Sequence, residues 1–193
     1  MKKKKIILGS SSKFRKSLMS ELNMNFECIS PDIDETRLFE EKAENMVIRL
    51  AIKKARKICG LTDNSLIISS DACASCEGRI LGKPLYKNIA IEYLEYISEK
   101  TIIFHTGLCV MDSDNMEHKT DIAKYTIKIK KLSEKDILQY VDTHEPYNSS
   151  AAFRYEVAKD LLVEEFIDLE NDISGLIGLP LKKLKVILNH YGV

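Results

Sequence analysis

The chain has 193 residues, and its 29 lysines and arginines equal its 29 aspartates and glutamates in number. A chain of this length buries roughly two thirds of its unfolded surface and suits a single domain. The balanced charge argues against nucleic acid or a membrane surface as a general partner, so any affinity for anions must be local.

The N-terminal segment contains a candidate anion site. Residues 6–8 predict a short strand, which runs through G-S-S-S into a helix predicted from Phe14 to Leu22. The small residues let a ligand approach the backbone, the first helix amides point outward, and Lys13, Arg15 and Lys16 add positive charge. The segment is therefore a candidate phosphate site, while the alternative is that residues 10–12 only cap the helix.

A loop rich in carboxylates follows the second predicted strand, Asn25–Ser30. This loop, Pro31–Thr36, reads P-D-I-D-E-T. Its acids are either solvated or ligands of a divalent cation, since magnesium needs only one or two carboxylates when substrate phosphates complete its shell.

The helix predicted from Glu44 to Cys59 places one lysine among its apolar residues. At about 100° per residue, Lys54 falls in the middle of the stripe formed by Val47, Leu50, Ala51, Ala55 and Ile58. Burying an ammonium group is costly unless an anion meets it, which favours a ligand role for Lys54. The alternative is a side chain that snorkels past its neighbours.

The apolar run Leu66–Ile68 predicts a buried central strand that ends at Ser69, Ser70 and Asp71. In open α/β sheets, ligands bind beyond the carboxyl ends of such strands. Asp71 is therefore the best candidate for a reacting carboxylate, and its alternative is a turn or cap aspartate.

Five cysteines in a chain without a recognisable export signal indicate reduced thiols and a cytoplasmic protein. Cys73 and Cys76 have the C-x-x-C spacing of zinc and redox sites, but no second pair accompanies them. We therefore expect them to behave as small buried apolar residues.

The rest of the chain predicts further elements and one more basic candidate. A hairpin over Glu77–Pro84 holds Lys83 extended before a proline, where it could reach a phosphate or simply be exposed. The other predicted elements are helices at Ile89–Ile97, Ser133–Val141 and Leu181–Leu188, strands at Thr101–Met111, Ile122–Lys130 and Leu161–Ile167, and a loop at Glu145–Glu156.

Together these motifs resemble the Maf (septum formation protein) family of nucleoside triphosphate pyrophosphatases. The motifs that carry the resemblance are S-S-S-K-F-R-K, D-I-D-E-T, R-L-A-I-K-K-A, S-S-D-A, G-K-P, H-T-G, Y-V-D-T-H-E-P and G-L-I-G-L-P-L. The resemblance implies one α/β Maf/ITPase-like domain over residues 1–193, with a mixed, curved sheet flanked by helices and a cleft between two lobes. It also implies hydrolysis between the α and β phosphates with a divalent metal, Mg²⁺ or Mn²⁺.

The resemblance assigns roles to individual residues. Asp71 stands at the family's proton-acceptor position and, with Glu35, at its metal position. The phosphate-contacting positions are Ser10, Arg15, Lys54 and Lys83. Three bases and a metal would offset the charge of the triphosphate while a carboxylate activates the attacking water.

Three residues bear on substrate choice. The family branch acting on 7-methyl-GTP has an aromatic residue at Phe14 and a glutamate at Glu156, whereas the dTTP and UTP branch has arginine and glutamine there. An aromatic face attracts the positive charge of N7-methylated guanine, and a carboxylate accepts hydrogen bonds from guanine N–H groups. Three features depart from this branch: Ala72 replaces its glutamine, Phe14 replaces its tryptophan, and residues 157–159 replace a glycine-containing turn.

The expected partner is therefore a nucleoside triphosphate, with 7-methyl-GTP or a similar modified nucleotide as substrate. One alternative is the same reaction on dTTP and UTP, and another is a non-catalytic nucleotide-binding regulator of cell division. We expect no nucleic-acid or membrane partner. A homodimer is implied by the resemblance alone.

Overall fold

The structure is a computed structural model that describes residues 4–167 and 171–193. Its described residues form two compact units, the first from 4–71, 106–123 and 171–193, the second from 72–105 and 124–167. Three long strands contribute residues to both units: β3 (Ser65–Cys76), β5 (Thr101–Asp112) and β6 (His118–Ile129). The predicted single domain and its cleft stay predictions.

The described strands form one seven-stranded mixed sheet. Its order is β2-β1-β3-β5-β6-β7, with β4 (Arg79–Leu81) paired antiparallel to β3. Strand β1 (Lys5–Leu8) lies parallel to both β2 (Glu27–Cys28) and β3, and β7 (Val163–Ile167) lies antiparallel to β6. The predicted mixed α/β class is confirmed.

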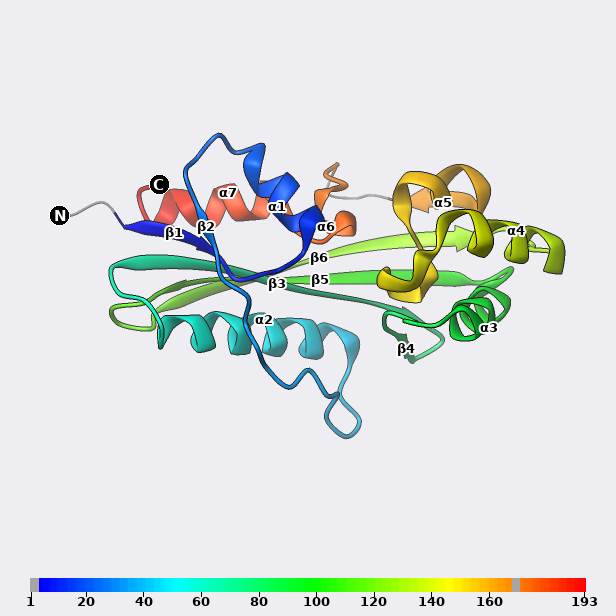
Figure 1. Cartoon of the computed structure of the whole chain (residues 1–193), viewed down its shortest axis with the longest axis horizontal. Coiled ribbons are helices and arrows are strands. Elements are labelled where there is room, and N and C mark those ends of the chain that lie inside the picture. Colours follow the sequence, from blue (N-terminus) through cyan, green and yellow to red (C-terminus); the bar gives the residue numbers. More distant parts are fainter. Residues whose placement is uncertain (1–3, 168–170) are drawn as a thin grey trace. The chain divides into compact units, whose positions relative to one another are not determined.

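Helices cover both faces of the strands in the first unit. Figure 1 shows α1 (Lys13–Ser20) and α7 (Leu181–His190) on one face and α2 (Ala43–Cys59) on the other. Successive strand residues point to opposite faces, so Ile6 and Leu8 pack with α1 and α7 while Ile7 packs with α2. Burial on both faces explains why the strands read as continuous apolar runs.

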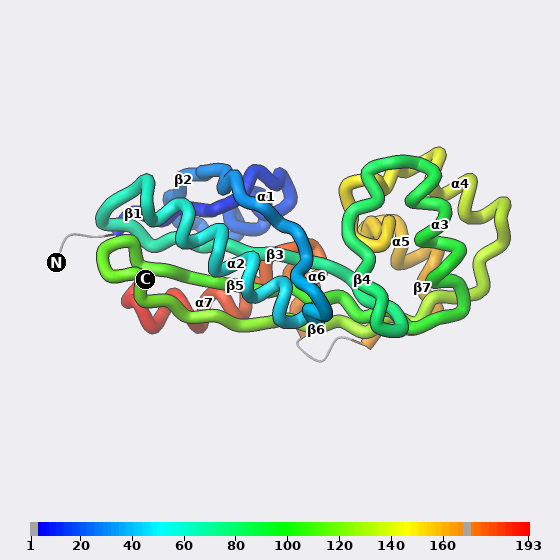
Figure 2. Tube along the Cα trace, turned by 90° about the horizontal axis from the view of Figure 1, so that it is seen from below, coloured from blue at the N-terminus to red at the C-terminus, as the bar shows by residue number. Residues whose placement is uncertain are grey.

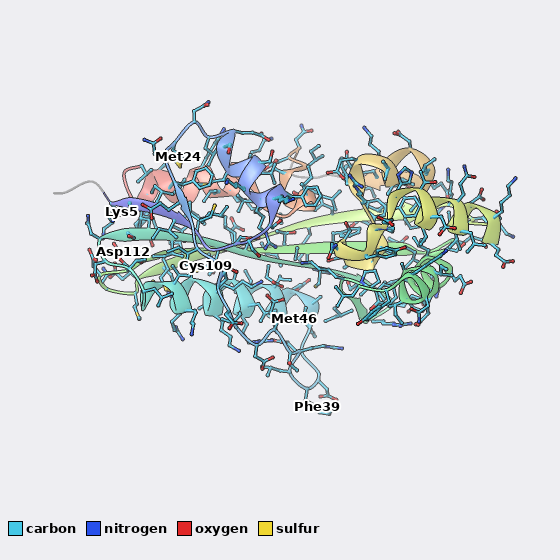
Figure 3. The ribbon with its side chains drawn as sticks, in the orientation of Figure 1. Lys5, Met24, Phe39, Met46, Cys109 and Asp112 are labelled. Carbon is cyan, nitrogen blue, oxygen red and sulfur yellow. The ribbon has the colours of Figure 1, made fainter. Side chains whose placement is uncertain are left out.

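Helix α2 packs closely on β5 because residue 107 is glycine. A Cβ at Gly107 would lie 2.5 Å from the backbone oxygen of Val47. Cys109, two residues further on, is fully buried between the sheet and α2 (Figure 3). This close approach places the inner side of α2 directly against the central strands.

The second unit is built from α3 (Lys87–Ile97), α4 (Glu134–His144), two 3₁₀ turns (Pro146–Asn148 and Ser150–Ala152) and α5 (Tyr155–Leu161), together with its strand segments. Figure 2 shows α3 beside α4. The predicted hairpin, helices and strands of this unit are present, and the predicted capping box at Ser133 is formed with Asp136.

Two sequence predictions need correction. Strand β3 does not end at Ser69, Ser70 and Asp71 but continues to Cys76, because buried partners satisfy these polar residues. The segment predicted as a loop and the start of a strand contains α5, whose seven residues are too few to show a clear period. None of the five cysteines is in a disulfide bond in the described residues, and Cys73 and Cys76 are buried.

The C-terminal segment adds α6 (Ser174–Ile177), a short helix ahead of α7 that the sequence analysis did not anticipate. None of the helices within residues 4–167 and 171–193 is long and apolar enough to cross a membrane.

Candidate active site

Lys54 is the buried centre of a charge cluster in the first unit. Its Nζ lies 2.6 Å from Asp71 Oδ1 and 2.7 Å from Glu35 Oε1. Lys54 is only 6% exposed, so the predicted inward direction from α2 is correct and the snorkelling alternative is wrong. The anions that meet it in this structure are the carboxylates of β3 and of the loop before α2.

Asp71 has the electrostatics of a candidate proton acceptor. Burial raises the pKa of Asp71, the charges of Lys54 and Arg15 oppose that rise, and the charge of Glu35 adds to it. A carboxylate with a raised pKa accepts a proton more readily near neutral pH than an exposed one does. Its place inside β3, with Lys54 on one oxygen, fixes the direction of this group.

Arg15 and Ser10 belong to the same part of the first unit. Ser12, not Ser10, caps α1 by accepting from the Arg15 backbone N–H. The buried Ser10 Oγ accepts from Ser12 N at 3.1 Å and from Arg15 Nη1 at 3.5 Å. Burial lowers the pKa of Arg15, while the negative charges of Asp71 and Glu35 oppose that change. An arginine remains protonated at neutral pH in either case.

The loop that carries Glu35 is fastened to α2 by two basic residues that lie outside the apolar stripe of this helix. Lys53 Nζ donates to the Asp34 carbonyl at 2.7 Å. Arg49 donates to both carboxylate oxygens of Glu41 at 2.5 and 2.7 Å and to the Thr36 carbonyl at 3.2 Å. Nothing in the sequence pattern pairs residues eight apart across a loop and a helix, so these anchors could not be found there.

Three predicted residues belong to the second unit. Ala72 follows Asp71 in β3, Lys83 is exposed just after β4, and Glu156 lies in the first turn of α5. Glu156 is 45% exposed, and its carboxylate is 4.0 Å from Arg154 Nε.

A buried tyrosine fixes the entry to α5. Tyr140 Oη donates to the Ala152 carbonyl at 3.1 Å and accepts from the Arg154 backbone N–H at 3.0 Å. These bonds hold the chain immediately before Glu156. The sequence offered no signal for this role of Tyr140.

Phe14, on α1 in the first unit, is 44% exposed. Phe14 is therefore accessible to a ligand, which is the condition its predicted role requires.

In the first unit the structure brings together the residues that were predicted to contact phosphate, bind a metal or accept a proton. These residues are Ser10, Arg15, Glu35, Lys54 and Asp71.

The donor set suits a metal that arrives with phosphates. Among the described residues, no group of three or more His, Cys, Asp or Glu side chains is arranged to hold a metal ion. Glu35 and Asp71 nevertheless direct oxygen atoms at the same point, Lys54 Nζ. Two carboxylates are enough for Mg²⁺ when substrate oxygens and water complete its shell, so these residues fit a metal–nucleotide complex.

Comparison with known proteins identifies relatives over almost the whole chain. A protein named 7-methyl-GTP pyrophosphatase from Colwellia psychrerythraea is 40% identical over 191 residues, covering 98% of this chain and 94% of the relative. Proteins of the same name from Pseudomonas savastanoi and Aliivibrio fischeri are 38% and 39% identical, covering 97% and 98% of this chain and 97% of each relative.

The solved structure of the Staphylococcus aureus Ham1 protein covers 82% of this chain and 91% of its own, at 16% identity and a TM-score of 0.48. That similarity is too weak to support an argument. The family model described as Maf-like protein matches residues 5–191. On that match and on its curated relatives, the chain belongs to the Maf family.

Proposed function

We propose that this protein hydrolyses 7-methyl-GTP to the nucleoside monophosphate and pyrophosphate in the cytoplasm. The observation that carries the proposal is the buried Lys54 ammonium group, which lies between the buried carboxylate of Asp71 and the exposed carboxylate of Glu35, because an enzyme of this kind needs a carboxylate base beside fixed positive charge. The names of the curated relatives support the reaction and the substrate.

In the proposed reaction Asp71 accepts a proton from the water that attacks the α phosphorus. The new P–O bond forms as the bond from the α phosphorus to the bridging oxygen breaks, and pyrophosphate leaves. The raised pKa of Asp71 supports this role, because the protonated state is then reached with less cost. One oxygen of Asp71 is held by Lys54, which leaves the other for the water.

Positive charge in the site would stabilise the phosphates. Arg15 and Lys54 are the two bases placed there, and Lys54 would exchange a carboxylate partner for phosphate oxygens when substrate binds. A divalent cation held by Glu35 and Asp71 would supply further positive charge to the phosphate oxygens. Lys83 is proposed as an additional phosphate contact.

Base selection is proposed to depend on Phe14 and Glu156. The exposed ring of Phe14 would stack on the cationic 7-methylguanine, an interaction of up to about 2 kcal/mol when desolvated. Glu156, exposed at the start of α5, would accept hydrogen bonds from the N1–H and amino groups of the base.

The test is pyrophosphate release from 7-methyl-GTP, GTP, UTP and dTTP, with Mg²⁺ or Mn²⁺ and with chelator, by the wild type and Asp71→Asn. Asp112→Asn is the matched control, because Asp112 is as buried as Asp71 (8% and 7% exposed) and also 2.6 Å from a lysine. We expect Asp71→Asn to reduce turnover by about 10²–10⁴-fold, the usual contribution of a general base. Asp112→Asn should keep its activity.

The remaining outcomes separate the alternatives. A preference for UTP or dTTP would retain the reaction and contradict the roles of Phe14 and Glu156. Pyrophosphate release that is unaffected by chelator would contradict the proposed need for a divalent metal. No release from any nucleotide by the wild type, with binding retained, would favour a regulatory nucleotide-binding protein.

A further inference from the structure

The turn that ends α6 receives hydrogen bonds from three separate elements of the first unit. The Thr106 hydroxyl donates to the Gly175 carbonyl, and the Ser70 hydroxyl donates to the Gly178 carbonyl, each at 2.8 Å. Arg15 Nε also donates to the Gly178 carbonyl at 2.8 Å. The H-T-G, S-S-D and G-L-I-G segments of the sequence therefore meet at one turn, to which the proposed reaction assigns no role.

The Gly178 carbonyl oxygen joins Ser70 to Arg15. A carbonyl oxygen has two lone pairs, so it accepts both bonds at once. The bond from Arg15 uses Nε and so fixes the plane of the guanidinium group, while the edge formed by the two Nη atoms stays directed elsewhere, with Nη1 3.5 Å from Ser10 Oγ. That outer edge can bind a phosphate in a bidentate manner.

The backbone conformation at Gly178 is one that glycine adopts more readily than other residues. Its φ is +128°, a conformation that side chains disfavour. A Cβ there would lie 3.4 Å from Arg15 Nε and 3.7 Å from its Cγ. A substitution would therefore strain the turn through its backbone conformation, while the added Cβ would make only an ordinary contact with Arg15.

The turn is also fixed by hydrogen bonds within its own segment of the chain. Asp172 accepts from the backbone N–H and hydroxyl of Ser174 and from the backbone N–H of Lys182, and Ser174 Oγ accepts from the Leu181 backbone N–H at 2.7 Å. These bonds join the two ends of the turn. The Gly178 carbonyl therefore presents its oxygen from a rigid support.

We propose that Ser70 and the Gly178 carbonyl are positioning groups that orient the Arg15 guanidinium for the triphosphate. This inference rests on the proposed function, in which Arg15 binds phosphate. It adds that the affinity of Arg15 for the triphosphate depends on the buried hydroxyl of Ser70, which acts through the Gly178 carbonyl. Preorganisation of this kind lowers the entropy lost when a flexible side chain binds.

Ser70→Ala tests the proposal, and the neighbouring Ser69→Ala is its matched control. Both serines are fully buried and each donates to a backbone carbonyl, but Ser69 bonds to Ala51 at 2.7 Å and not to the turn. The two variants should lower the melting temperature similarly. Only Ser70→Ala should raise KM for 7-methyl-GTP, about five-fold, the equivalent of one hydrogen bond. An equal rise in KM for both variants would overturn the proposal.

A double-mutant cycle with Arg15→Lys separates positioning from general structure. Lysine lacks the Nε–H that the Gly178 carbonyl accepts, so Ser70→Ala should change KM little in the Arg15→Lys background. Additive effects of Ser70→Ala and Arg15→Lys would contradict a shared mechanism. If Ser70→Ala does not fold, Ser70→Cys replaces it, because a thiol is a much weaker donor than a hydroxyl, with Ser69→Cys as the control. An equal rise in KM for these two variants would then overturn the proposal.

One measurement is independent of turnover. In ¹⁵N-labelled protein, the Arg15 Nε–H signal is identified by its loss in Arg15→Lys. It should exchange slowly with solvent in the wild type and in Ser69→Ala, and faster in Ser70→Ala. Equal exchange in the two serine variants would overturn the positioning role. Failure of the wild type to release pyrophosphate would instead contradict the proposed function. The exchange rates of the Arg15 Nε–H could still be interpreted in that case.

Discussion

The two groups of candidate residues are held in very different ways. In the first unit Lys54 and Asp71 are buried and lie 2.6 Å apart. In the second unit Glu156 is 45% exposed and lies 4.0 Å from its nearest charged partner, Arg154. Burying charge is costly, so a buried charged cluster is itself an argument for function. An exposed glutamate gives no such argument, and the proposed role of Glu156 depends on the family.

The largest expected effect concerns the buried cluster. Lys54→Met would leave the Asp71 carboxylate buried without its cation and beside Glu35. We expect the free energy of unfolding to fall by about 3 kcal/mol. This value is at the low end for a broken buried ion pair, because Glu35 is 57% exposed. Urea denaturation at pH 7 measures it. The control is Lys53→Met, whose lysine binds a backbone carbonyl of the loop, Asp34 O, and should cost below about 1 kcal/mol. Equal losses would contradict the importance of the cluster.

The next effect tests whether an exposed residue can still control selectivity. Phe14→Leu keeps an apolar side chain but removes the aromatic face, so the preference for 7-methyl-GTP over GTP should fall by up to about 30-fold, equivalent to about 2 kcal/mol. The ratio of kcat/KM for the two nucleotides measures it. Phe39→Leu is the control, since Phe39 is 93% exposed in the loop before α2 (Figure 3). An unchanged ratio in Phe14→Leu would contradict stacking.

A smaller loss of stability is expected in the second unit, where Tyr140 holds the chain before Glu156. Tyr140→Phe removes the hydroxyl that bonds Ala152 and Arg154, leaving two backbone groups without that partner, at a cost of about 1.5 kcal/mol. Burial raises the pKa of Tyr140 to about 12, so the hydroxyl keeps its proton throughout the measurement. Thermal denaturation measures the loss. Tyr96→Phe, whose hydroxyl bonds the Cys76 carbonyl at 3.2 Å in a partly exposed position, is the control with the smaller expected loss.

The smallest effect concerns the support of the turn after α6. Burial alone would raise the pKa of Asp172, but the bonds from Ser174 and Lys182 outweigh it and lower the pKa below the ordinary value of 3.8. The stability that this carboxylate contributes is therefore complete above about pH 4 and is lost as the pH falls through the lowered pKa. The wild type should exceed Asp172→Asn by about 1 kcal/mol at pH 6, and the difference should shrink toward pH 3.

Urea denaturation across this pH range measures that difference. Asp160→Asn, at an exposed position on α5, is the control. A constant difference between the wild type and Asp172→Asn from pH 6 to pH 3 would show that the ionised carboxylate is not what stabilises the turn.

Sequence patterns were most informative where burial imposes a period. The apolar stripe of α2 predicted the inward direction of Lys54, because a helix repeats every 3.6 residues and one lysine interrupts an otherwise apolar face. Apolar and alternating patterns likewise found the long strands β5 and β6. Such patterns failed at α5, where seven residues give too little of the period to distinguish a helix from a loop.

The end of β3 was predicted wrongly because of its polar residues, and the reason is physical. Serine and aspartate usually mark the end of a buried strand, because their polar groups need partners. Here the partners come from distant segments: Ser69 bonds to α2, Ser70 to the turn after α6, and Asp71 to Lys54. No local pattern reveals such partners, so the strand was predicted to end too early.

The sequence by itself determined the family, the fold class and the choice of Asp71, Lys54 and Arg15 as candidates, since these follow from motifs and periodicity within short segments. The tertiary structure decided which groups hold them. The Glu41–Arg49 anchor and the Gly178 carbonyl that binds Arg15 join residues 8 and 163 positions apart in the chain. Such contacts depend on the packing of whole elements, which side-chain periodicity does not encode.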